Sequence, residues 1–227
     1  MNIDQERATP FSRTEKFRSN ASDLRPQKLE EIVAANARLA FGLVDTPSVR
    51  SRVYDLRLLF YKEEFPYLLG GTHGRAGEDA FDKDSLIFYC RDGDAIIGTC
   101  RVTPLIEKQW EISPCMPKHV LLPTDADTVQ LNRVYVLQSH CNICVHEFMF
   151  YHFAELLLRY TSFRRYFAIC SAPLVRLYKR IGARLAHPDA FRLNDRAQHN
   201  YYFVAGTISA FREAVEARYH LPPKPIL

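Results

Sequence analysis

The sequence lacks a long apolar run. Nowhere in its 227 residues are there the ~20 consecutive apolar residues that a membrane-spanning helix needs. Residues 1–31 are polar and charged, and they contain no apolar core of a secretion signal. These absences predict a cytoplasmic chain with no membrane span, and they leave peripheral contact with lipid open.

The chain also lacks the cysteine pattern of a disulfide framework. Its six cysteines are scattered, which favours reduced thiols. Cys141 and Cys144 form a Cys-x-x-Cys pair between His140 and His146, but no second well-spaced pair follows, as zinc sites usually have. Cysteines in the first turn of an apolar helix usually pack in the core, so we predict no bound metal.

Acidic residues are missing from residues 156–188. The formal net charge of +4 is too small to indicate nucleic acid as a partner. Within 156–188, however, the acidic and basic side chains are all basic: Arg159, Arg164, Arg165, Arg176, Lys179, Arg180 and Arg184. A patch of one sign attracts an acidic partner. The alternative is a solvated helix face whose acidic partners lie elsewhere in the fold.

What is present predicts one α/β domain. The chain is long enough for a single large core, with an arm and short helix over residues 1–36 and a domain over 37–227. Periodicity and capping residues predict helices over 24–36, 49–65, 145–161, 173–182 and 207–218. Strands are expected over 37–44, 86–91, 95–105, 128–137, 166–171, 184–193 and 201–205. A hairpin followed by a strand–helix–strand unit predicts a mixed sheet flanked by helices.

The stretch 79–105 combines this hairpin with charged residues. Two apolar runs flank Asp92-Gly93-Asp94, a strong hairpin-turn signal. Acidic residues precede the first run, and Arg101 lies inside the second. Residues 66–78 before it contain four glycines and predict a loop that either closes over a ligand or only connects two elements.

The strand over 128–137 carries a second arginine. Strict period-2 alternation places on one face Val129, Leu131, Arg133, Tyr135 and Leu137, and on the other Gln130, Asn132, Val134 and Val136. An unpaired guanidinium beside apolar neighbours is costly. We therefore expect Arg101 and Arg133 to pair with Glu78, Asp79 or Asp82, or with a substrate carboxylate. The alternative is a buried ion-pair network without contact to substrate.

Several short motifs fall in a known order: Leu56-Arg57 followed by Tyr61, Asp79-x-x-Asp82 around Phe81, Gly98-x-x-Arg101, and Arg133-x-x-Val136. In this the chain resembles the acyl-homoserine-lactone (autoinducer) synthases and the similar long-chain N-acyl amino acid synthases. Autoinducer synthases have Trp where this chain has Tyr67, and Glu where it has Gln130. These departures favour the N-acyl amino acid synthase pattern over one that uses S-adenosylmethionine.

The resemblance implies a GNAT (acyl-CoA N-acyltransferase) fold and an acyltransferase. It would move a long-chain fatty acyl group from an acyl carrier protein to the amine of an amino acid or similar small molecule, with no tightly bound cofactor. The turn over residues 138–144 has no glycine to expose backbone N–H groups to a pyrophosphate, which favours the acyl-phosphopantetheine of the carrier over acyl-CoA. Alternatives are autoinducer synthesis, acetyl-CoA-dependent transfer, and a non-catalytic acyl- or protein-binding module.

The residues that this interpretation assigns fall into three groups. The catalytic group consists of Asp79, Asp82, Arg101 and Arg133. The substrate-binding group consists of Arg57, Tyr61, Glu78, Gln130 and Tyr135. The residues expected to dock the acidic carrier are Arg164, Arg165, Arg176, Lys179 and Arg180.

Overall fold

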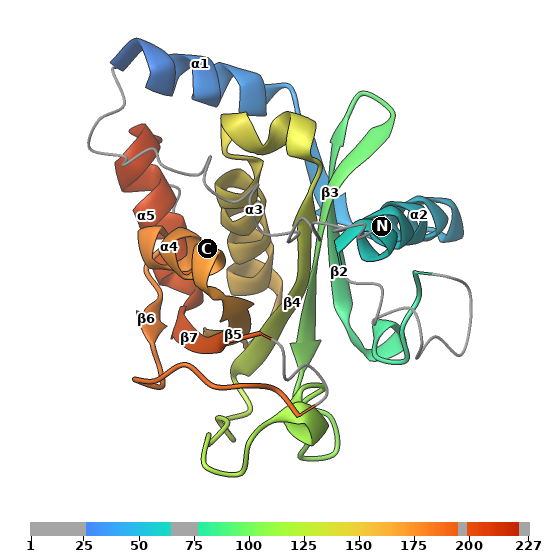
Figure 1. Cartoon of the computed structure of the whole chain (residues 1–227). Coiled ribbons are helices and arrows are strands. Elements are labelled where there is room, and N and C mark those ends of the chain that lie inside the picture. Colours follow the sequence, from blue (N-terminus) through green and yellow to red (C-terminus); the bar gives the residue numbers. More distant parts are fainter. Residues whose placement is uncertain (1–25, 65–76, 195–198, 223–227) are drawn as a thin grey trace, which may run out of the picture.

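The computed structural model describes residues 26–64, 77–194 and 199–222, and its core is one mixed sheet (Figure 1). The helices are α1 (Pro26–Ala37), α2 (Pro47–Glu64), α3 (Val145–Tyr160), α4 (Ala172–Arg180) and α5 (Ile208–Tyr219), with short 3-10 helices at Asp82–Asp84, Ser113–Cys115 and Gln138–Ile143. The strands are β1 (Ala40–Leu43), β2 (Leu86–Asp92), β3 (Ala95–Pro104), β4 (Thr128–Val136), β5 (Arg165–Ser171), β6 (Arg184–Leu185) and β7 (Tyr201–Thr207).

The sheet has the strand order β1-β2-β3-β4-β5-β7-β6. All neighbouring pairs are antiparallel except β4 and β5, which are parallel and joined through α3. This confirms the predicted mixed sheet and the hairpin, whose turn has Gly93 at a φ of 55°. The strand expected over 184–193 is wrong in extent: only Arg184–Leu185 pair as β6, and the chain beyond them is irregular apart from a bridge at Phe191.

The two faces of the sheet are covered differently. Helices α1, α3, α4 and α5 lie on one face, where Phe150, Phe153 and Phe211 are fully buried (Figure 1). On the other face, α2 packs on β2 and β3 through Val53 and Ile87. The segment between β3 and β4 covers the rest of that face, with its own apolar cluster around Trp110 and Phe167. On this face, charged side chains of β3 and β4 can therefore contact one another only in the space between α2 and this segment.

Local signals explain where the helices begin and end. Thr46 caps α2 by accepting a hydrogen bond from the Val49 N–H, and Thr207 caps α5 by accepting one from the Ala210 N–H. Ile32 of α1 is buried in the main core, while residues 1–25 lie outside the described residues. The division of the chain at residue 36 therefore stays a prediction. None of the described helices is both long enough and apolar enough to cross a bilayer.

Strand β4 departs from the predicted alternation at Arg133. Thr99 of β3 pairs with Tyr135, but Arg101 pairs with Asn132, so β4 carries one extra residue, and Arg133 has a φ of 50°. This β-bulge reverses the two faces beyond it. Val129 and Leu131 share one face, as predicted, and pack in the main core, but after the bulge the residues on that side are Val134 and Val136. The predicted common face of Arg133 with Val129 and Leu131 is therefore wrong, and Arg133 joins the α2 side.

The parallel pair of β4 and β5 is short. Only Thr128, Val129 and Gln130 of β4 pair with β5, although β5 pairs with β7 along its whole length. In the described part of the chain, residues 131–136 of β4 and 168–171 of β5 have no strand partner on the edges that face each other. We call these two edges the open part of the β4–β5 pair.

Candidate active site

Three arginines and three carboxylates meet beside the β4 bulge, and we call this set the Arg101 network. Its members are Arg57 of α2, Asp79 and Asp82 of the segment before β2, Arg101 of β3, Glu111 of the β3–β4 segment, and Arg133 of β4. The formal charges cancel. Five of the six were expected as site residues, and the structure brings those five together.

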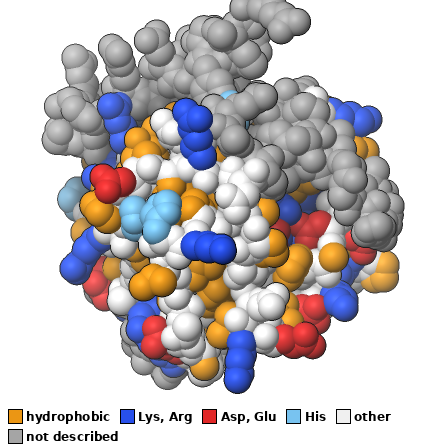
Figure 2. Space-filling model, turned by 60° about the horizontal axis from the view of Figure 1, so that its bottom comes forward, with side chains coloured by type: hydrophobic (Ala, Val, Ile, Leu, Met, Phe, Trp, Pro, Cys, Tyr) orange, Lys and Arg blue, Asp and Glu red, His pale blue; other side chains and the backbone are white. Residues whose placement is uncertain are grey.

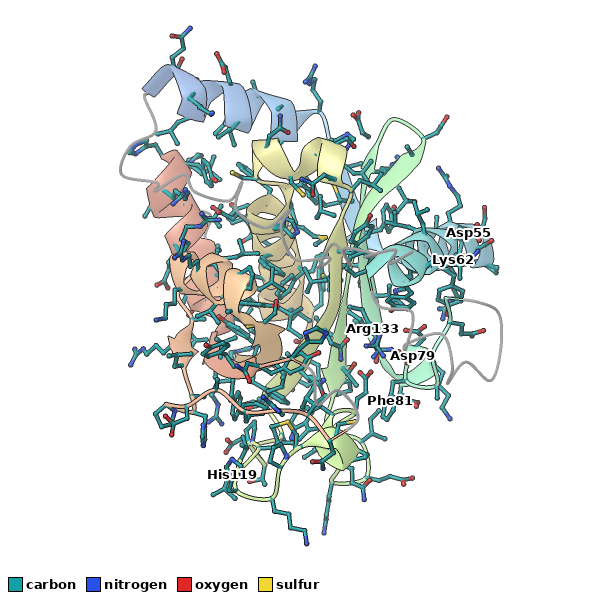
Figure 3. All side chains as sticks on the ribbon, viewed as in Figure 1. Asp55, Lys62, Asp79, Phe81, His119 and Arg133 are labelled. Atoms are coloured by element: carbon teal, nitrogen blue, oxygen red, sulfur yellow. The ribbon has the colours of Figure 1, made fainter. Side chains whose placement is uncertain are left out.

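Arg101 is the centre of the network and is fully buried. Its Nη1 donates to Asp79 and Asp82, its Nη2 to Glu111, and its Nε to Asn132 Oδ1 at 2.8 Å. Arg133 donates from Nε and Nη2 to Asp79 Oδ2 at 2.9 and 2.7 Å, and from Nη2 to Glu111 Oε1 at 2.8 Å. Figure 3 shows Arg133 and Asp79 side by side. Every Arg101 nitrogen is therefore engaged inside the protein, and four of the five N–H donors of its guanidinium have a partner there.

The segment that carries Asp79 and Asp82 approaches α2 closely at Gly77. A Cβ on Gly77 would lie 2.2 Å from the Tyr54 carbonyl oxygen, and the φ of 89° also favours glycine. Beyond it, the Asp79 N–H donates to Asp82 Oδ2 at 3.0 Å, and Asp79 Oδ1 accepts from the Phe81 N–H at 2.9 Å. These local bonds direct both carboxylates toward the arginines.

Electrostatics make Asp79 a poor base. Burial disfavours its charged form, but the charges of Arg101 and Arg133 and their hydrogen bonds outweigh burial and hold the pKa of Asp79 well below its usual range. A carboxylate with so low a pKa rarely takes up a proton at neutral pH. The role of base is therefore not one that the geometry supports for Asp79.

The network divides into a buried part and a rim. The side chains of Arg57, Arg101 and Asp82 are at most 1% exposed. Those of Arg133, Asp79 and Glu111 are 16%, 18% and 12% exposed, so these three form the rim.

Unused hydrogen-bond donors remain on α2. The Nη1 of Arg57 donates to both oxygens of Asp82 at 2.8 and 2.9 Å, while its Nε and Nη2 are buried and have no hydrogen-bond partner among the described residues. One turn further along α2, the Tyr61 hydroxyl is buried and likewise has no partner in the described part of the chain. The Tyr61 ring lies under the guanidinium of Arg133 at 6.0 Å, and burial raises the pKa of Tyr61. Buried donors of this kind can be satisfied by an ordered water or by an acceptor group of a ligand.

The other expected substrate-binding residues lie at the edges of this site. Tyr135 stacks on Phe60 of α2 with the ring centroids 3.9 Å apart, and the Gln130 side chain is buried with its Oε1 unpartnered. Glu78 comes directly before Asp79 in the chain, and burial, the charge of Asp82 and the charge of Glu78 raise the pKa of Tyr54 of α2. Tyr67 lies outside the described residues.

Glu111 is the site residue that sequence reasoning missed. Its Oε1 accepts from Arg133, and its Oε2 accepts from Arg101 and from Asn132 Nδ2 at 2.6 Å. It lies in an irregular segment with several prolines, where no periodicity assigns a face to a side chain. The only signal was its position next to Trp110, the one tryptophan of the chain, which is 3% exposed.

The expected carrier-docking residues differ in how many partners they have. Arg165 pairs with Asp125 and Asp127, Arg180 pairs with Glu147, and Arg164 donates to two backbone carbonyls. Arg176 and Lys179 are exposed on α4. On the face shown in Figure 2, basic side chains stand apart from one another rather than in one patch.

A second buried ion network lies at the start of α3, and we call it the Glu147 network. Glu147 pairs with Arg180 at 3.1 Å and with Arg218 at 3.2 Å, and it accepts a hydrogen bond from the Tyr219 hydroxyl at 2.9 Å. It was not predicted, although an acid within an apolar helix was a visible signal. The nearby Cys141 thiol donates to the carbonyls of Val136 and Leu137, and burial raises its pKa to about 11.

No cluster of three or more His, Cys, Asp or Glu side chains able to hold a metal occurs in residues 26–64, 77–194 and 199–222.

The architecture is similar to that of solved acyltransferases. MesI, a CoA-dependent acyl-homoserine lactone synthase, matches with a TM-score of 0.63 and 16% identity over 82% of this chain and 98% of its own. FeeM, an N-acyl amino acid synthase from uncultured soil microbes, matches with a TM-score of 0.53 and 9% identity over 82% of this chain and 99% of its own. The chain has the GNAT fold. At these identities the likeness shows the fold alone, and it confirms the predicted one.

The fold also occurs in an acetyltransferase. Aminoglycoside 6'-acetyltransferase type Ii matches this chain with a TM-score of 0.53 and 13% identity, over 74% of this chain and 97% of its own. No protein-family model and no curated protein sequence matches the chain. The reaction therefore has to be argued from the site.

Proposed function

We propose that this chain is an N-acyltransferase. It moves a fatty acyl group from the phosphopantetheine thioester of an acyl carrier protein to the amine of an amino acid or a similar small molecule. The neutral amine attacks the thioester carbonyl carbon, the C–S bond breaks, and the proton lost by the nitrogen ends on the leaving thiolate, directly or through water.

The observation that carries this proposal is the open part of the β4–β5 pair beside the Arg101 network. In a strand, alternate backbone N–H and C=O groups point to the same edge. Those of residues 131–136 that point away from β3 have no strand partner among the described residues. An extended chain with amide groups, such as phosphopantetheine, binds such an edge as an added strand. The N–H groups there can also stabilise the tetrahedral oxyanion.

The acceptor amine is supported on the other side of the bulge. Asp79 is the most exposed carboxylate of the network, and an ammonium group would approach it first. The unused donors of Arg57 and Tyr61 lie deeper and suit a carboxylate. This pattern supports an amino acid, which carries both groups, over a simple amine.

The start of α3 favours a carrier protein over CoA. A pyrophosphate binds where several N–H groups and cations face it at a helix N-terminus. Here the Cys144 N–H donates to the Cys141 carbonyl at the end of a 3-10 helix. The cations Arg180 and Arg218 are engaged by Glu147, which is 1% exposed. The phosphopantetheine of a carrier protein has a single phosphate, so it needs fewer N–H donors and cations at this helix end than a pyrophosphate does.

A second candidate, autoinducer synthesis, is supported by the higher similarity to MesI than to FeeM, with TM-scores of 0.63 and 0.53. In that reaction the acceptor amine belongs to S-adenosylmethionine, and the product closes to a lactone. Gln130, in place of the glutamate of those synthases, supports the first candidate instead.

The purified chain tests both. It is given acyl-carrier protein or acyl-CoA of one chain length, with a mixture of the amino acids or with S-adenosylmethionine, and products are identified by mass spectrometry. We expect an N-acyl amino acid, formed faster from the carrier. An acyl lactone would establish the second candidate, and no acyl product from either donor would sink both.

A pair of variants tests whether the acceptor substrate binds at Arg57. Arg57→Gln should raise the acceptor KM by about tenfold to a hundredfold, since it removes charged hydrogen bonds to the substrate. Lys62→Gln, an exposed residue on the same helix, is the matched control and should leave KM unchanged. Equal KM values for the two variants would move the acceptor away from Arg57 without affecting the proposed reaction.

A further inference from the structure

The bulge at Arg133 needs an explanation, because its backbone is one that L-residues disfavour. Arg133 has a φ of 50°, in the left-handed region, inside a strand and without the freedom of glycine. Such a conformation persists only where the surroundings hold it. The side chain of Arg133 is held at its far end by Asp79 and Glu111.

Glu111 contacts the bulge from more sides than the other two carboxylates. Its two oxygens accept from Asn132 and Arg133, the consecutive residues at the bulge, and from Arg101, the β3 residue that pairs with Asn132. Asp79 and Asp82 have no described hydrogen bond to Asn132. Glu111 thus joins both strands at the point where their register shifts.

Glu111 is itself held firmly by its neighbour. The Trp110 indole N–H donates to the Pro123 carbonyl at 2.7 Å, and its ring packs edge-on against Phe167 of β5, with centroids 4.8 Å apart. The Trp110 backbone N–H donates to Ser113 Oγ at 3.0 Å. The segment therefore presents the carboxylate from a fixed backbone.

We propose that Glu111 is a positioning residue that acts through Arg133. It holds the β4 bulge, and the bulge lies where β4 parts from β5, which is where the proposed reaction places the thioester. This inference rests on the proposed function for its kinetic consequence only. The mechanical part, that Glu111 fixes the bulge, stands on the contacts themselves.

Gln130 offers a way to move the carboxylate. It lies two residues before Asn132, on the same strand and before the bulge, so the two side chains share a face. Its side chain is buried, and its Oε1 has no hydrogen-bond partner among residues 26–64, 77–194 and 199–222. A carboxylate at position 130 would therefore face the same arginines from β4 that Glu111 faces from the β3–β4 segment.

The experiment uses four variants of the full chain: Glu111→Gln, Gln130→Glu, the two combined, and Glu107→Gln. Glu107 is an exposed acid in the same segment and serves as the matched control. For each variant, kcat and both KM values are measured, and amide hydrogen exchange is followed in the peptide that spans β4.

We expect Glu111→Gln to lower kcat by about a hundredfold, since a small displacement of reacting groups has an effect of that order. Both KM values should change by less than about threefold, because the residue does not touch substrate. Exchange should become faster in β4 and remain unchanged in β7. The combined variant should regain at least about tenfold in kcat, and Glu107→Gln should match the wild type.

Three results would overturn the inference. One is a Glu111→Gln variant that matches Glu107→Gln in kcat and in exchange. Another is faster exchange across the whole sheet, which would mean a general loss of stability. The third is a combined variant that is no better than Glu111→Gln, and this one decides the matter even if Glu111→Gln alone does not fold. If the wild type transfers no acyl group, the proposed function fails, while exchange in β4 still tests the role of Glu111.

Discussion

The molecule contains two buried ion networks, and they are built in opposite ways. In the Glu147 network, each charge sits at a helix end that favours it: Glu147 in the first turn of α3, Arg180 in the last turn of α4, and Arg218 in the last turn of α5. In the Arg101 network, four of the six charges come from strands and irregular segments, Asp82 lies in a three-residue 3-10 helix and Arg57 lies inside α2, so the charges rely on one another.

This difference separates stability from positioning. The helix ends stabilise the charges of the Glu147 network independently of the sheet. The ion pairs of this network therefore join three helices to one another. No charge of the Arg101 network lies at the end of an α-helix, and the network lies at a strained bulge beside the open part of the β4–β5 pair. We infer that the first network serves mainly folding, and the second mainly the geometry of the reaction.

Removal of Arg101 should have the largest effect on stability and on activity, and it tests the difference between the two networks most directly. Arg101→Ala leaves Asp79, Asp82 and Glu111 facing one another without their shared cation. Breaking a buried network by deleting one partner costs about 3–5 kcal/mol. We expect a loss of that size in the free energy of unfolding by urea, together with loss of acyl transfer. A stable, fully active Arg101→Ala would refute both the network and the site.

Removal of the Glu147 charge should cost less and leave the chemistry intact. Glu147→Gln keeps a hydrogen-bond acceptor but leaves two arginines without their anion, so we expect a loss of about 1–3 kcal/mol in unfolding free energy. At a temperature where the variant is folded, kcat should equal that of the wild type. Glu155 lies on α3 like Glu147 and pairs with Arg212 of α5, so Glu155→Gln is the control and should cost less than about 1 kcal/mol. A fall in kcat for Glu147→Gln would contradict the inference that the Glu147 network serves mainly folding.

Sequence reasoning recovered the fold because the strong signals are local. Helix caps at Thr46 and Thr207 and the turn at Gly93 each depend on a few adjacent residues. The meeting of Arg57, Asp79 and Arg101 was also accessible, since buried arginines need partners and the resemblance supplied candidates.

Two features of the site were out of reach for a physical reason. The bulge at Arg133 arises from pairing with β3, so alternation within β4 alone gave the wrong face. Glu111 lies in an irregular segment whose path is fixed by the Trp110 contacts, and no period relates it to the strands. Both depend on contacts between segments far apart in the chain.

The pH dependence of the unfolding free energy should separate His146, next to the Glu147 network, from Asp79 of the Arg101 network, because each affects stability in its own pH range. Burial and the charge of Arg180 lower the pKa of His146, next to Glu147, to about 4 from its ordinary 6.5. Between these values the unfolded chain binds a proton that the folded chain does not. The contribution is therefore present above pH 6.5 and is lost as the pH falls toward 4, by less than about 1.4 kcal/mol per pH unit.

Asp79 acts in the lower window. Its pKa in the folded chain is lowered, so its contribution is present above about pH 4 and is lost only below that. Urea unfolding from pH 3 to 8 measures both. His146→Gln should flatten the curve between pH 4 and 6.5, and Asp79→Asn should flatten it below pH 4. The same slope change in both windows for either variant would contradict the assignment.

The smallest effect on stability is expected for exposed basic residues. Here the comparison is between basic residues that have described partners and basic residues that have none. Arg176 and Lys179 are exposed on α4, while Arg165 is bound by Asp125 and Asp127. Replacing Arg176 and Lys179 together by Glu should change unfolding free energy by no more than about 0.5 kcal/mol. It should raise the KM for acyl-carrier protein by about tenfold at low salt, and less at high salt, with no change for acyl-CoA. Arg165→Ala should leave that KM unchanged, because its charge is already neutralised. An equal rise for both donors would mean that these side chains serve the common thioester and not the acidic carrier.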